Sequence, residues 1–135
     1  MTVAVAHQAA TAQALRVAAQ EAAYRNARLA VIHVADSLDD DIAAANEAGI
    51  SDAVEKALAD CGLDHVEWDL HLVAGGIEKG DVAGAILDQV KGVAPELLVI
   101  GARRRSPVGK AFLGSVAQTL ILEADTPVLV VQEAR

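Results

Sequence analysis

Aromatic residues and cysteine are what this sequence has least of. Phe, Trp and Tyr make up 2% of the 135 residues, so a folded core has to be built from aliphatic side chains. Cys61 is the only cysteine, which excludes an internal disulfide, and its place on the apolar face of an expected helix predicts a small core residue. Apolar residues nevertheless reach 53%, enough to bury the core of a single domain spanning residues 1–135.

Positive charge is also scarce, because 11 Lys and Arg stand against 19 Asp and Glu. The resulting net charge of −8 disfavours non-specific binding to nucleic acid. No apolar run approaches the length that spans a membrane, and the first residues, "MTVAVAHQ", lack the basic stretch and apolar block of a signal peptide. We therefore expect a cytoplasmic protein whose partners include neither nucleic acid nor a membrane.

Groupings of side chains that would mark a metal centre or an active site are missing as well. The four histidines have no metal-ligand spacing to one another or to Cys61, and His33, inside an apolar run, is expected to be a hydrogen-bonded core histidine. The acidic stretch 36–41 lacks the glycine and closing glutamate of a calcium loop. Ser106 and Ser115 have no neighbouring base and no nucleophile-elbow pattern. We expect no metal site and no enzyme.

The sequence does contain a regular alternation of apolar runs and helical patterns. Strands are expected at 2–6, 28–34, 66–72, 95–101 and 126–131. Between them apolar residues recur at helical spacing, as at Ala12, Leu15, Ala19 and Ala22. This order predicts an α/β fold: an open, five-stranded parallel sheet with helices on both faces.

The third of these runs differs from the others because it alternates strictly. Glu67, Asp69 and His71 separate the apolar residues of 66–72, which is typical of a strand with one face in solvent. We therefore expect this strand at an edge of the sheet, and the uniformly apolar run 97–100 near its centre.

A basic, glycine-rich stretch, "GARRRSPVGKAFLGSV" (101–116), follows that central run. Ligands of open parallel sheets bind beyond the carboxyl ends of the strands, where this stretch begins. Gly114 and Ser115 open an expected helix, whose first N–H groups could donate to a phosphate. The alternative is that Ser115 only caps its own helix. The spacing matches neither a P-loop nor a dinucleotide-binding glycine motif.

The chain resembles the universal stress protein family over nearly its whole length, through "TVAVA", "RLAVIHV", "LLVIG", "LGSVAQTLI" and "TPVLVV". The resemblance implies a Rossmann-like sheet of strand order 3-2-1-4-5 with a ligand cleft between the first and fourth strands. Nucleotide-binding members carry Gly, two residues, Gly, nine residues, then Gly-Ser or Gly-Thr. Here Gly101, Arg104, Gly114 and Ser115 keep that spacing, with arginine in place of the middle glycine. Ala6 stands where ATP-binding members have an aspartate that contacts the nucleoside.

The resemblance also implies a ligand and a set of contacts. The ligand is ATP or a related adenine nucleotide, which Mg²⁺ could accompany, and the main chain of Val34 would hold the base. The phosphates and ribose would be held by Gly101, Arg104, Gly114, Ser115 and Val116. Additional phosphate contacts could come from Arg103, Arg105, Gly109 and Lys110.

The function expected from these features is that of a stress-response sensor or adaptor. The last strand would leave an open sheet edge, so we expect a homodimer through Val128, Leu129, Val130 and Val131, as the resemblance also implies. One alternative is a nucleotide-free dimeric interaction module, in which Ala6 and Arg104 mark a lost site. Another is a hydrolase of the wider adenine-nucleotide α/β group; slow ATP hydrolysis or autophosphorylation is open, although no residue argues for it.

Overall fold

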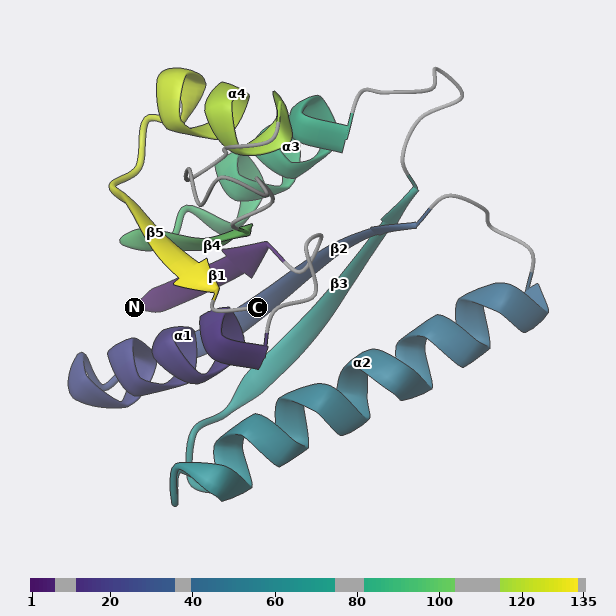
Figure 1. The fold of residues 1–135 in the computed structure, drawn as a ribbon, viewed down its shortest axis with the longest axis vertical. Helices are drawn as coiled ribbons and strands as arrows, with labels where there is room; N and C mark the ends of the chain where they lie inside the picture. The colour runs from purple at the N-terminus through teal and green to yellow at the C-terminus, as the bar shows by residue number, and fades with distance from the viewer. Residues whose placement is uncertain (7–11, 36–39, 75–81, 104–114, 134–135) are drawn as a thin grey trace, which may run out of the picture.

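The computed structural model describes residues 1–6, 12–35, 40–74, 82–103 and 115–133 (Figure 1). The five strands are β1 (Thr2–Ala6), β2 (Arg28–Ala35), β3 (Trp68–Ala74), β4 (Leu97–Arg103) and β5 (Val128–Glu133). They form one parallel sheet in the order β3-β2-β1-β4-β5, which confirms the order implied by the resemblance.

Four helices connect the strands and cover both faces of the sheet (Figure 1). They are α1 (Ala12–Tyr24), α2 (Asp40–Asp60), α3 (Val82–Val93) and α4 (Ser115–Glu123). α1 and α2 share one buried cluster with the sheet, and α3 and α4 share the other. The predicted doubly covered parallel sheet is therefore confirmed, and residues 7–11, 36–39, 75–81 and 104–114 between these elements lie outside the described part.

Each central strand divides its side chains between the two faces. In β1, Val3 and Val5 pack with α1 and α2, whereas Ala4 and Ala6 pack with α3 and α4. This is the period-two alternation of a strand that is buried on both sides. No aromatic side chain lies among the fully buried ones of the described residues, so the shortage of aromatics does produce an aliphatic core.

Alanine lets α1 lie close to the sheet. Its buried face consists of Ala14, Leu15, Ala18, Ala19 and Ala22. Three of the four expected positions are confirmed. The prediction that Ala12 belongs to the buried face is wrong, because Ala12 is the first residue of the helix and is exposed.

Residues with a positive φ follow three of the helices, at the points where the chain turns back toward the amino edge of the sheet. Asn26 (φ 56°) follows α1, Gly62 (φ 67°) follows α2, and Ala94 (φ 50°) follows α3. At α3 the N–H of Ala94 donates to the carbonyl of Val90 at 2.8 Å, a common way to close a helix. The next strand can therefore begin within a few residues.

Two expectations from the sequence need correction. Cys61 is not a core residue: α2 ends at Asp60, the chain turns at Gly62, and the thiol is half-buried with its Sγ 3.8 Å from Gln20 Nε2. β3 is at an edge, as expected, but its polar face is only partly in solvent, because His71 is half-buried and meets α3.

Candidate functional site

The carboxyl edge of the sheet has one position where the strand order reverses. β1 lies between β2 and β4, so the chain leaves it toward β2 and β3 and later returns on its other side as β4 and β5. β1 and β4 pair in parallel, with Val3 opposite Leu97 and Val5 opposite Val99. Their carboxyl ends, Ala6 and Arg103, therefore finish at the same edge, where open α/β sheets bind their ligands.

Four of the residues expected at this site are placed by the structure. Ala6 ends β1 and is 8% exposed. The Val34 side chain is 2% exposed and packs in the α3–α4 cluster, so only its main chain can face a ligand. Gly101 lies in β4 opposite Val131, and Val116 is half-buried in the first turn of α4. The structure thus leaves the end of β1 without a carboxylate.

The remaining expected contacts stay predictions. Ser115 begins α4 and Arg103 ends β4, but only their backbones are described. The other expected contacts lie outside the described residues: Arg104, Arg105, Gly109, Lys110 and Gly114. Their placement around a phosphate therefore rests on the spacing of the motif.

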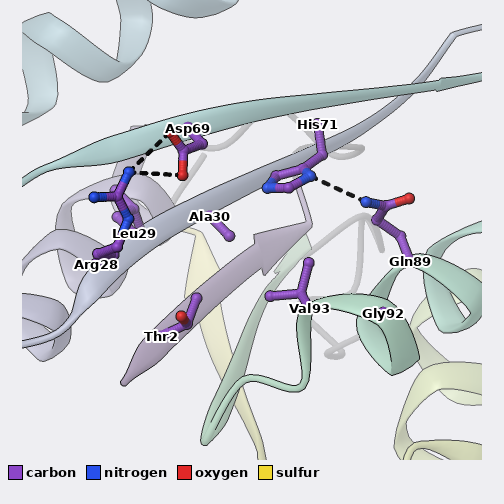
Figure 2. A pocket seen from close by; sticks show the side chains of 9 residues that line it. All are labelled: Thr2, Arg28, Leu29, Ala30, Asp69, His71, Gln89, Gly92 and Val93. Atoms are coloured by element: carbon purple, nitrogen blue, oxygen red, sulfur yellow. Dashed lines mark hydrogen bonds and ion pairs between the residues drawn. The ribbon is translucent and has the colours of Figure 1, made fainter.

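A concave region lies at the opposite, amino edge of the sheet (Figure 2). We call it the amino-edge pocket; its volume is about 390 Å³. Its floor consists of Thr2, Arg28, Ala30, Asp69 and His71, from three neighbouring strands. The alternation of each strand puts these five on the face that carries α3. The last turns of α3 form the opposite wall.

Arg28 organises one end of the amino-edge pocket. Its Nη2 donates to both carboxylate oxygens of Asp69, at 3.0 and 2.8 Å, and its Nη1 donates to Glu67. The hydrogen bond to Asp69 raises the pKa of the Arg28 guanidinium above its usual value. Because the side chains of Arg28 and Asp69 are about half exposed, these ion pairs add little to the stability of the fold.

His71 and Gln89 form the other end of the amino-edge pocket. The His71 ring points across the sheet toward α3, and its Nδ1 lies 3.0 Å from Gln89 Nε2 (Figure 2). An amide N–H can only donate, so Nδ1 accepts and the ring proton of the neutral imidazole sits on Nε2. The sequence pattern showed the polar alternation of β3 but not that α3 would end above it, which depends on tertiary packing.

A second groove, of about 370 Å³, runs between α3 and the end of α4. Leu87, Val90 and Ala124 contribute apolar surface, and Asp88 and Lys91 contribute charge. Within the described residues no three His, Cys, Asp or Glu side chains come together as a metal site, and no helix there is long and apolar enough to cross a membrane.

Comparison with known proteins identifies the family. The model of the universal stress protein family matches residues 1–132, so the chain belongs to the universal stress proteins. A universal stress protein of Mycolicibacterium smegmatis is 52% identical over 52 residues, 38% of this chain and 40% of that relative. The Thermus aquaticus "universal stress protein in QAH/OAS sulfhydrylase 3'region" is 31% identical over 127 residues, 89% of this chain and 88% of its own length.

Solved structures of the family agree with this fold. A universal stress protein from Archaeoglobus fulgidus is 33% identical, with a TM-score of 0.72 over 97% of this chain and 98% of its own. A universal stress protein from the same organism in complex with dAMP is 28% identical, with a TM-score of 0.67 over 97% of both chains.

Proposed function

We propose that this universal stress protein binds an adenine nucleotide, ATP or a relative, at the carboxyl edge between β1 and β4. The observation that carries the proposal is the strand reversal between β1 and β4, where Ala6 ends β1 and Gly101 lies in the last three residues of β4. The dAMP complex of the relative that is 28% identical supports an adenine nucleotide as the ligand. The Gly101, Gly114 and Ser115 spacing supports a phosphate contact at the start of α4.

The residues at the ends of β1 and β2 shape how the nucleoside is held. Ala6 presents a methyl group, and the Val34 side chain is committed to the core. The base and ribose would then be bound by main-chain N–H and C=O groups, which are uncharged hydrogen-bond partners. Because a hydrogen bond to a charged group contributes ~1.5–3 kcal/mol and a neutral one about 1 kcal/mol, we expect weak affinity.

The phosphates then provide most of the attraction. Arg104 replaces a motif glycine and would offer a guanidinium to the phosphates, with Arg103, Arg105 and Lys110 adding positive charge. Val116 and Gly109 complete the proposed set, and Mg²⁺ could neutralise part of the phosphate charge. In the alternative, the Arg104 side chain fills the cleft, no nucleotide binds, and the protein acts as a nucleotide-free interaction module.

The proposed role is that of a stress-response sensor or adaptor rather than an enzyme. Binding would change partner contacts at the carboxyl edge, and no nucleophile or base in the sequence argues for hydrolysis. The cytoplasmic location expected from the sequence stays a prediction.

A homodimer through β5 is part of the proposal. Among the described strands β5 pairs only with β4, and its residues Val128–Val131 are each half-buried. On α4, Ile121 is 40% exposed and Leu122 is 82% exposed, and neither lines the amino-edge pocket or the groove between α3 and α4. Pairing of two β5 strands about a two-fold axis would complete the hydrogen bonding of both edges and bring apolar surface together.

A direct test measures nucleotide in the purified protein. The chain is denatured, the supernatant is analysed for adenine nucleotides, and ATP is titrated into the folded protein by calorimetry with and without Mg²⁺. We expect binding in the micromolar to millimolar range. Absence of both released nucleotide and heat at millimolar ATP contradicts the proposal. If Arg104→Gly and Arg104→Ala both bind ATP more tightly than the parent, the arginine obstructs the site.

A further inference from the structure

We propose that the amino-edge pocket is a second binding site, which takes a small organic cation: a protonated amine or amidine carried on a short apolar body. The pocket lies at the other edge of the sheet from the nucleotide site and shares no residue with it, so this inference stands independently of nucleotide binding. Its volume of about 390 Å³ falls at the lower end of the range for small-molecule pockets, roughly 300–1,000 Å³.

Small residues line the hollow between the sheet and the end of α3. Thr2 and Ala30 form the floor on β1 and β2, and Gly92 stands in the last turn of α3 (Figure 2). Gly92 is exposed, and a Cβ added there would meet no atom within 4 Å, so the rim of the pocket is open at this point. Larger residues in place of Thr2 and Ala30 would have filled part of the gap between the sheet and the end of α3.

The charges around the pocket favour a cation. Arg28 is shared by two carboxylates, Glu67 and Asp69, so the ionic cluster carries a net charge of −1. The end of α3 adds the negative end of a helix dipole. The basic residue of that last turn, Lys91, lines the groove toward α4 and not this pocket. An anion would instead have to displace Asp69 from the Arg28 guanidinium.

The polar groups of the pocket suit a molecule with two ends. Asp69 and His71 are two residues apart on one face of β3, a separation of about 7 Å along the strand. An ammonium beside the Asp69 carboxylate would leave its apolar body over Ala30 and against Val93. A second polar group would then reach the His71–Gln89 pair, which offers an imidazole nitrogen and an amide oxygen.

The test is an NMR titration of the ¹⁵N-labelled chain with n-butylammonium chloride, and with sodium butyrate as an anion with the same number of carbon atoms. Both series are run at constant ionic strength, because salt screens exposed charges. The amine should shift the amides of Ala30, Asp69 and Gly92, and butyrate should not. Equal shifts with both probes, or none with the amine well above the millimolar range, overturn the proposal.

Three variants locate the bound amine. Asp69→Asn should weaken amine binding at least about tenfold, because a charge-assisted contact is lost. Asp52→Asn makes the same change at an exposed site on α2, on the other face of the sheet, and should bind as the parent does. Thr2→Leu should weaken binding by filling the floor of the pocket, where the half-buried Thr2 side chain lies. Unchanged binding in Asp69→Asn, unchanged binding in Thr2→Leu, or an equal loss in Asp52→Asn contradicts a site at this place.

Discussion

A carboxylate placed at the end of β1 should strengthen nucleotide binding and weaken the free protein at the same time. Ala6→Asp introduces the group at the position that is 8% exposed, next to the β1–β4 boundary. A charge-assisted hydrogen bond to the nucleoside contributes ~1.5–3 kcal/mol, which corresponds to a 10- to 150-fold lower Kd for ATP.

The cost to the free protein follows from the same burial. A poorly solvated carboxylate without a partner costs more than the about 1–3 kcal/mol of a neutral polar group, and for a chain of this size 1 kcal/mol lowers the Tm by roughly 4 °C. Burial raises the pKa of such a group above its unfolded value of about 3.9. The penalty is therefore absent below that pH and grows as the pH rises through the folded-state pKa.

The matched control is Ala6→Asn, which has nearly the same shape and no charge. The Kd for ATP should fall in the order alanine, asparagine, aspartate, as measured by calorimetry at neutral pH, and saturating ATP should restore part of the Tm lost in Ala6→Asp. Equal affinity of the aspartate and asparagine variants, or no gain in either, would refute the view that the missing carboxylate limits binding.

Three further changes test the packing, the helix ends and the open edge. Ala94→Gly should raise the free energy of unfolding in urea by about 0.5–1 kcal/mol, because a φ of 50° strains alanine. Gly62→Ala should lower it by a similar amount. A change of the same sign in both variants would contradict this reasoning. Ile86→Ala should cost ~2–5 kcal/mol with an unchanged m-value, since its side chain is fully buried between α3 and the sheet, and a loss under 1 kcal/mol would mean looser packing. Leu122→Lys should raise the dimer Kd measured by analytical ultracentrifugation without lowering the stability of the monomer. Tyr24→Lys, at a site on α1 that is 90% exposed, should leave the dimer Kd unchanged. Equal effects of the two substitutions would place the interface elsewhere.

The fold could be predicted because its signals are local. Apolar runs such as 97–100 and the three- and four-residue spacing around Leu15 belong to single elements, and their alternation leaves few topologies for a parallel sheet. The strand order needed the family resemblance, because nothing in the composition of β1 says which strands flank it.

The features that were missed depend on contacts between elements. Cys61 follows the helical spacing of α2, yet the helix stops one residue earlier, so a continuous pattern placed it wrongly in the core. The amino-edge pocket brings Arg28, His71 and Gln89 together from three elements, and only the crossing of α3 over the sheet creates it. At the carboxyl edge the sequence supplied the motif, and the structure adds that Ala6 and Gly101 lie in the carboxyl halves of two adjacent strands.

The central claim is that an adenine nucleotide binds where β1 and β4 end, and an amide NMR titration of the unmodified chain with ATP and Mg²⁺ tests it most directly. Saturable shifts are expected at Ala6, Val34 and Gly101, with Thr2 and Gly92 at the opposite edge unaffected. Shifts confined to the amino edge, or none at ATP concentrations well above the millimolar range, would contradict it.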